Sequence, residues 1–168
     1  MAFIDIDTDE KINPITFYNV FDSVGRGGRN MAEDVKVVQF FLKRAFETDL
    51  LKDTKNSEAM TWKTLVPDGK CGPITNSWIK MFQLEVRSRG GGNILVDGLV
   101  EKAGNANSNK ISSFSKTGYT IRWLNAILRD FDKEVYQNLT THREVPADLK
   151  LIFLQIQAEG PAMNFGNN

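Results

Sequence analysis

The sequence predicts a mainly α fold: a compact helical core with short β elements and two extra C-terminal helices. Three observations predict it. Apolar residues recur at helical spacing in four separate segments. Turn-forming Gly and Pro residues stand between those segments. The composition is that of an ordinary globular protein, with 41% hydrophobic and 25% charged residues, and 168 residues are enough to bury one core.

The first helix is expected after a short extended lead-in. Residues 15–21 are rich in aromatic and β-branched side chains, which favours a strand, and a glycine-containing loop follows at residues 23–29. Asn30 and Glu33 have the spacing of an N-cap residue and its capping-box partner. The helix that they open should bury one wide face, formed by Val35, Val37, Val38, Phe41, Leu42 and Phe46.

A long polar connection over residues 49–64 leads to the second helix. Residues 67–73 form a dense turn signal, in which Pro73 suits the first turn of a helix and Thr75 is an alternative cap. Trp78, Ile79, Phe82 and Val86 follow at helical spacing. Glycines at 90–92 end this helix, and residues 94–100 suggest a short strand and a turn.

Two further helices are expected in the C-terminal third. Residues 103–115 are rich in Asn, Ser and Gly and are the best linker candidate. The third amphipathic helix carries Ile121, Leu124, Ile127, Leu128 and Phe131, with Trp123 beside the apolar face. Pro146 opens the last helix, whose apolar positions are Leu149, Ile152, Phe153 and Ile156. Gly160 and Pro161 end it, and we expect the tail to residue 168 to fray.

The charge balance and the termini exclude several classes of partner. Lys plus Arg and Asp plus Glu number 21 each, so we expect no nucleic-acid partner, because such partners require an excess of cations. No apolar run approaches the roughly 20 residues of a membrane-spanning helix. The acidic N-terminus lacks the features of a signal peptide. We therefore expect synthesis in the cytoplasm without a signal peptide, followed by delivery to the periplasm or cell wall by another route, or incorporation into a phage-tail-like particle.

No catalytic signature is present, so we expect no catalytic residue, no metal site and no cofactor. His142 is the only histidine and lacks a companion ligand at short spacing, so it is interpreted as a surface residue. Cys71 is the only cysteine, so an internal disulfide is excluded. A nucleophilic Cys71–His142 pair is the less favoured interpretation, because Cys71 lies in a tight turn that the fold explains. The carboxylates Glu47, Glu85 and Asp97 have no supporting signature for glycoside cleavage, and a small wall hydrolase is the least favoured function.

Residues 23–102 carry an ordered set of motifs. The first helix has Asp34-Val35, Val38-Gln39 and Leu42; the turn has Asp68-Gly69, Gly72 and Thr75; the second helix has Ile79 and Phe82-Gln83; Asp97-Gly98 and Val100 close the set. In this order they resemble the peptidoglycan-binding domain-like family of small helical cell-wall-binding modules. The long connection at residues 49–67, Cys71 in the turn and the last 60 residues depart from the family pattern.

The resemblance implies a non-catalytic module that binds the glycan or the stem peptide of peptidoglycan. It implies a ligand-binding surface at Trp62, Asp68, Gly69 and Thr75. It also divides the chain into a module with its lead-in over residues 1–102 and a helical extension over residues 103–168, packed on the same core. A second interpretation stays open: a structural or adaptor component of a leaderless phage-tail-like, contractile injection or type VI secretion apparatus, with an interface near Trp123 or Phe165.

Overall fold

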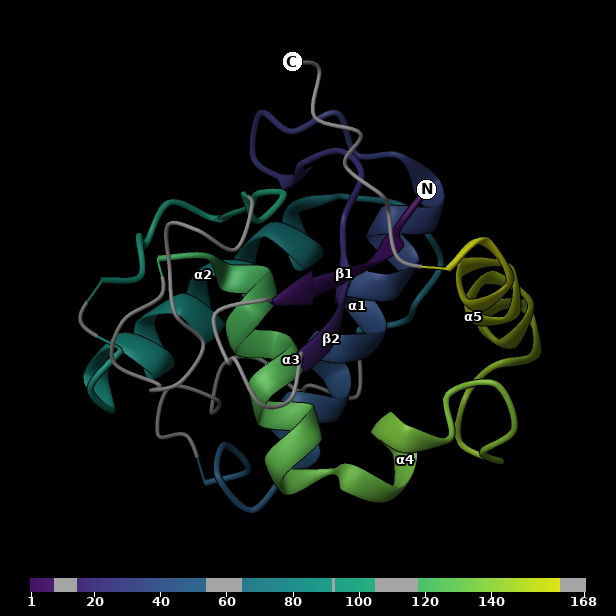
Figure 1. The fold of residues 1–168 in the computed structure, drawn as a ribbon. Helices are drawn as coiled ribbons and strands as arrows, with labels where there is room; N and C mark the ends of the chain where they lie inside the picture. The colour runs from purple at the N-terminus through teal and green to yellow at the C-terminus, as the bar shows by residue number, and fades with distance from the viewer. Residues whose placement is uncertain (8–14, 54–64, 92, 105–117, 161–168) are drawn as a thin grey trace.

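The computed structural model describes residues 1–7, 15–53, 65–91, 93–104 and 118–160, and these form five helices and two small antiparallel sheets (Figure 1). The helices are α1 (Ala32–Glu47), α2 (Pro73–Ser88), α3 (Thr120–Phe131), α4 (Lys133–Gln137) and α5 (Ala147–Glu159). The strands are β1 (Phe3–Asp7), β2 (Ile15–Asn19), β3 (Val24–Gly25) and β4 (Leu99–Val100). The predicted mainly α class is confirmed.

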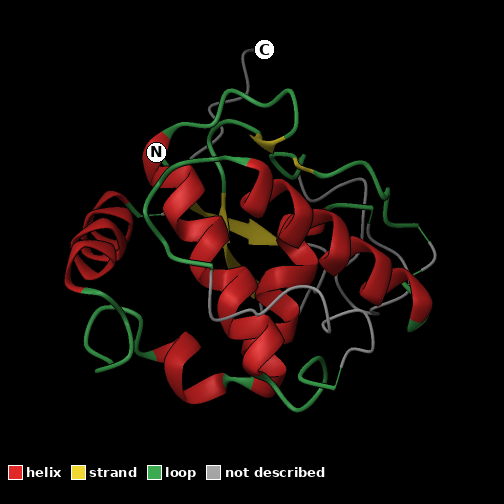
Figure 2. Cartoon of the chain, turned by 180° about the vertical axis from the view of Figure 1, so that it is seen from behind, coloured by secondary structure: helices red, strands yellow, loops and turns green. Residues whose placement is uncertain are grey.

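Helix α1 lies at the centre of the fold and contacts α2, α3 and α5 (Figure 2). All six apolar positions predicted for its face are buried. The apolar face is wider than that of a surface helix because α1 is covered by other elements on several sides. The Phe46 ring meets the rings of Trp78 and Phe82 on α2 edge-on, with centroids 4.9 and 6.3 Å apart. The predicted packing of the first two helices on each other is thus confirmed.

Strands β1 and β2 form an antiparallel hairpin that packs beside α3 and α5. Asn125 on α3 binds β2 through both polar atoms of its side-chain amide: its Oδ1 accepts from Tyr18 N at 2.8 Å, and its Nδ2 donates to Tyr18 O at 2.9 Å. The strand predicted at residues 15–21 is confirmed for residues 15–19. Its partner β1 was not expected from the sequence.

The predicted capping box at the start of α1 is wrong. Met31 occupies the N-cap position, and no side chain caps the helix. Asn30 instead adopts a left-handed φ of 54°, and its amide bonds to Gly25 N and O and to Gly28 O at 2.8–3.1 Å. Asn tolerates this backbone conformation better than most residues. It therefore shapes the preceding loop rather than the helix end.

Helix α2 begins as predicted, with Pro73 at its first position after Gly72. Thr75 does not cap it, because its hydroxyl faces the preceding turn, 3.3 Å from Lys70 O. The strand expected near residues 94–100 is limited to β4, which pairs with β3 through Val24 and Val100. Most of the linker candidate and the tail after residue 160 lie outside the described residues.

One hydrophobic cluster includes residues on both sides of position 102, such as Val38 and Phe82 before it and Leu124 and Phe153 after it. Within the described residues, no helix combines the length and the apolar character needed to cross a membrane.

Candidate functional site

The shape of the predicted turn depends on Gln39, whose side chain reaches from α1 into the loop before α2. Its Nε2 lies 3.1 Å from Asp68 Oδ1 and 3.1 Å from Lys70 O. The same nitrogen lies 3.0 Å from Thr75 Oγ1. Its Oε1 accepts the Gly69 N–H at 3.0 Å. We call these five residues the first node; a single buried amide joins α1, the Asp-Gly turn and the first turn of α2.

Gln83 on α2 forms a second node with the same arrangement. Its Nε2 lies 2.9 Å from both Asp97 Oδ1 and Leu99 O, and 3.0 Å from Thr120 Oγ1 on α3. Its Oε1 accepts the Gly98 N–H at 2.8 Å. The central glycine of each node has a φ of 77°. The chain therefore contains the same structural unit twice, and α3 supplies the last residue of the second copy.

The sequence contains a signal for this repeat in the spacing of threonine and tryptophan. Thr75 and Thr120 each precede a tryptophan by three positions, Trp78 and Trp123, and both tryptophans are buried. The segment between Gly98 and Thr120 is much longer than the segment between Gly69 and Thr75. In the second motif the Asp-Gly turn and the threonine are therefore far apart in the sequence.

Three of the four predicted ligand-binding residues meet in the first node. Thr75 is 2% exposed and its hydroxyl is bonded inside the chain. Gly69 is buried, and a Cβ there would approach Ala32 O to 2.9 Å. Asp68 is exposed, and the Lys70 backbone N–H is the main cause that lowers the pKa of its carboxyl. Trp62 lies outside the described residues. Gly69 and Thr75 thus set the shape of the turn, while Asp68 reaches the surface.

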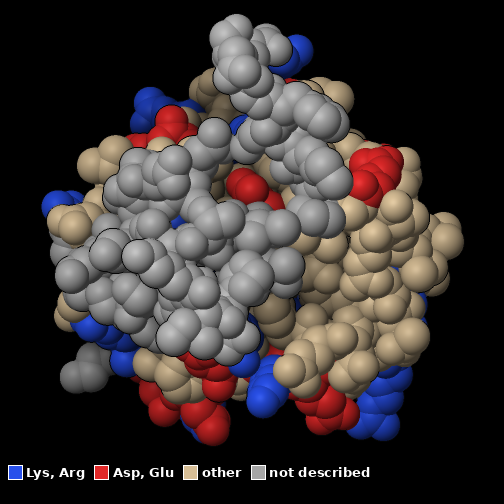
Figure 3. Space-filling model, viewed as in Figure 1, with Lys and Arg blue, Asp and Glu red and all other residues tan. Residues whose placement is uncertain are grey.

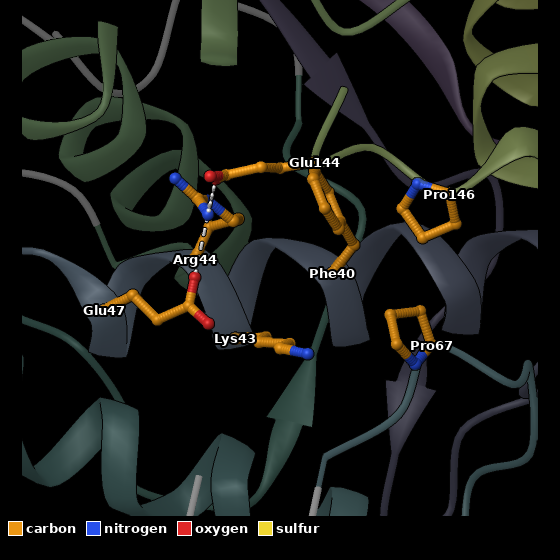
Figure 4. Close-up of a pocket in the computed structure, with 7 residues that line it drawn as sticks. All are labelled: Phe40, Lys43, Arg44, Glu47, Pro67, Glu144 and Pro146. Atoms are coloured by element: carbon orange, nitrogen blue, oxygen red, sulfur yellow. Dashed lines mark hydrogen bonds and ion pairs between the residues drawn. The ribbon is translucent and has the colours of Figure 1, made fainter. Parts of the chain in front are cut away.

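Two hollows flank this turn. The turn hollow, of about 270 Å³, is bordered by Gln39, Asp68, Lys70 and Thr75 and by the apolar side chains of Val66 and Ile74. Val66 and Ile74 are 60% and 54% exposed. The ionic hollow, of about 430 Å³, is lined by Phe40, Lys43, Arg44, Glu47, Pro67, Glu144 and Pro146 (Figure 4). Val66 and Pro67 are adjacent, so one short segment borders both hollows.

Arg44 organises one wall of the ionic hollow. Its guanidinium binds Asp132 in a bidentate pair, with Nε–Oδ2 at 2.7 Å and Nη2–Oδ1 at 3.0 Å. Its Nη1 donates to Glu47 at 2.9 Å and to Glu144 at 2.5 Å. Burial raises the pKa of Glu47, because the loss of solvation outweighs the attraction of Arg44. One carboxylate from the same helix and two from distant parts of the chain thereby fix one arginine.

His142 and Cys71, the two residues considered as a nucleophilic pair, contact different partners. His142 is half-buried, with Nε2 3.5 Å from Glu134 Oε1, and the Cys71 Sγ lies 3.4 Å from Asn76 Oδ1. Burial raises the pKa of the Cys71 thiol, which disfavours the nucleophilic thiolate.

The three candidate carboxylates also have different binding partners. Glu47 binds Arg44, Glu85 lies 3.6 Å from Arg89, and Asp97 belongs to the second node. No group of three or more His, Cys, Asp or Glu side chains in the described part of the chain is placed to hold a metal ion.

A third hollow, of about 230 Å³, lies between the ends of α1, α2 and α3. We call it the apolar hollow; its lining consists of Leu50, Leu51, Val86, Arg89, Trp123, Ile127 and Phe131. Trp123, which was predicted to lie near an interface, is 3% exposed and forms part of its wall, whereas Phe131 is 48% exposed. Phe165 lies outside the described residues.

Comparisons of the chain with protein-family models, with curated proteins and with solved structures returned no match. The geometry of the nodes and hollows is therefore the basis for a functional hypothesis.

Proposed function

We propose that the chain is a non-catalytic module that binds peptidoglycan. The observation that carries this proposal is the pair of equivalent nodes: Gln39 and Gln83 each close an Asp-Gly turn onto a threonine. The motifs behind the resemblance to cell-wall-binding modules thus belong to one repeated structural unit. An accidental match of common dipeptides would not require the glutamines to contact the turns.

The surface around the first node supports binding of an extended ligand. The turn hollow offers exposed apolar side chains and the Asp68 carboxylate, and the ionic hollow offers both signs of charge beside Phe40 and Pro67. Peptidoglycan combines sugar hydroxyls and acetamido methyl groups with charged peptides. Polar groups among apolar walls are the usual means of orienting such a ligand.

Co-sedimentation of the full chain with purified sacculi tests the proposal. Val66→Asp and Ile74→Asp alter exposed side chains at the turn hollow, and we expect each to lower the apparent affinity roughly tenfold without unfolding. Leu95→Asp is the matched control, because Leu95 is 61% exposed and lines none of the three hollows. A folded protein that remains in the supernatant would overturn the proposal. Release of dye from labelled sacculi above a buffer control would contradict its non-catalytic part.

A second candidate is an adaptor role in a phage-tail-like, contractile injection or type VI secretion apparatus. It is favoured by apolar surface: Phe131 borders the apolar hollow, and Leu151 and Leu154 on α5 are 67% and 50% exposed. Figure 3 shows a wide area without charged side chains over α5. Protein interfaces often centre on such patches.

The two candidates predict opposite sensitivities. In an adaptor, Phe131→Asp should abolish co-purification with a purified tail or sheath subunit encoded beside this chain, and Val66→Asp should not. Sedimentation with sacculi would then be absent for the native protein.

A further inference from the structure

The ionic hollow contains two cations that differ in their bonding. Lys43 and Arg44 are adjacent on α1, and Phe40 and Glu47 extend the same face at spacings of three and four. Arg44 is bound by three carboxylates, so its charge is more than compensated. Within the described part of the chain, no carboxylate forms a salt bridge with Lys43, although Glu47 attracts it at longer range. Of these two cations, only Lys43 is therefore available to an anionic ligand.

The ionic network also keeps the neighbouring wall in place. Asp132 and Glu144 come from the segments after α3 and before α5, and both bind Arg44. Side-chain exposure is 16% for Arg44 and 14% for Asp132, so this pair is well shielded from solvent. A shielded bidentate pair resists exchange with a ligand better than an exposed one. A ligand in the hollow is thus expected to contact Lys43 without breaking the network.

The opposite side of the hollow is apolar. Figure 4 shows Arg44, Glu47 and Glu144 grouped together, Pro67 and Pro146 across from them, and the Lys43 nitrogen turned toward Pro67. Phe40 lies between Lys43 and the prolines along the helix face. An ammonium group beside three rings suits a carboxylate that carries a small aliphatic side chain next to it. The volume, about 430 Å³, falls within the roughly 300–1,000 Å³ of small-ligand sites.

We propose that the ionic hollow binds the free C-terminal carboxylate of an extended peptide, with Lys43 as the carboxylate-binding residue and Phe40, Pro67 and Pro146 as the apolar contacts. This inference rests on the proposed function and assigns the stem peptide, rather than the glycan, to this part of the surface. A half-buried ammonium forms a stronger pair with a carboxylate than a fully exposed one. Where a stem peptide is attached, the lactyl carboxyl of the glycan is consumed in the amide bond, so the free carboxylates lie on the peptide.

The test is a calorimetric titration of the full chain with two synthetic stem pentapeptides, one with a free C-terminal carboxylate and one amidated. We expect the native protein to bind the free acid at least about fivefold more tightly than the amide. Lys43→Gln should bind both peptides equally, at the affinity of the amide for the native protein. Lys80→Gln, at an exposed position on α2 that lines none of the three hollows described above, is the matched control and should retain the difference.

Equal affinity of the native protein for the two peptides would overturn the inference, and so would a Lys43→Gln variant that still discriminates between them. Sedimentation with sacculi separates this failure from failure of the proposed function. Native protein that binds sacculi but not the free-acid peptide refutes only the peptide assignment. Native protein that binds the free-acid peptide through Lys43 but does not sediment with sacculi refutes the wall-binding function and supports the carboxylate site.

Discussion

Gln39 and Gln83 lie on different helices and make the same set of hydrogen bonds. Each Nε2 contacts an aspartate Oδ1, a backbone carbonyl and a threonine hydroxyl, and each Oε1 accepts the N–H of a glycine with a φ of 77°. Both amides are almost fully buried, at 2% and 0% exposure. The two turns that the sequence suggested separately are therefore held by equivalent side chains, and both should respond alike to substitution.

Replacement of either glutamine with alanine should destabilise the fold by about 1–3 kcal/mol, because the glycine N–H in each node would lose its partner in a buried setting. Urea denaturation of Gln39→Ala and Gln83→Ala measures this loss. Gln155→Ala, on the exposed face of α5, is the control and should change the free energy of unfolding by less than about 0.5 kcal/mol. A large loss at one node and none at the other would show that the nodes are not energetically equivalent.

The two node glycines should differ in their tolerance of alanine. Both have the left-handed φ that disfavours a side chain, which should reduce the free energy of unfolding by about 1–2 kcal/mol in either variant. At Gly69 the new Cβ would also lie 2.9 Å from Ala32 O, whereas at Gly98 the nearest atom, Asn76 O, is 3.9 Å away. Gly69→Ala should therefore be the less stable variant in thermal or urea unfolding. Equal losses would mean that the chain near Ala32 relaxes freely.

Leu42→Ala should destabilise the protein by about 2–5 kcal/mol, because Leu42 is fully buried on the central helix and its removal leaves a cavity. Leu151→Ala removes the same atoms from a side chain that is 67% exposed, and its effect should be small. Chemical denaturation of the pair compares one chemical change in two environments. Similar losses for both would place Leu151 in an interface that forms in solution.

Asp34 should make stability depend on pH. Burial raises the pKa of its carboxyl above the ordinary 3.8, and the backbone N–H groups of Phe21 and Asp22 only partly offset this effect. The folded state then holds the proton more tightly than the unfolded state. The Asp34 contribution is fully present below pH 3.8 and is lost as pH rises through the folded pKa.

Asp34→Asn removes this titration and also replaces one of the two oxygens that accept from Phe21 and Asp22. We expect the variant to be less stable at low pH, and its deficit relative to the native protein to shrink as pH rises above 3.8. Urea denaturation at constant ionic strength follows the difference. A deficit that stays constant across this range would contradict the assigned direction.

The helices could be predicted from the sequence because periodic burial is a local signal. Val35 and Leu42 on α1, Trp78 on α2 and Ile127 on α3 each belong to the apolar series of their own helix, and all are buried. The role of Asn30 could not be predicted, because its spacing to Glu33 also satisfies a capping box, and the competing bonds to the loop appear only in the folded chain.

The candidate site was predictable only in part. Asp68, Gly69 and Thr75 were found because they are close in sequence, and the structure does bring them together. The ionic hollow was missed because Arg44 meets Asp132 and Glu144 across 88 and 100 positions of chain, and no local pattern records such contacts.

The unequal spacing in the two nodes has a consequence for what the chain can carry. Six positions separate Gly69 from Thr75, but 22 separate Gly98 from Thr120. The entropy of closing a loop grows only with the logarithm of its length, so a connection of 22 rather than 6 positions costs only about 1 kcal/mol more. Thr120 arrives on α3, which is independently packed against α1, and this contact holds the second turn closed. We therefore expect the chain to accept a reporter or a second binding sequence between residues 104 and 118 without loss of the fold.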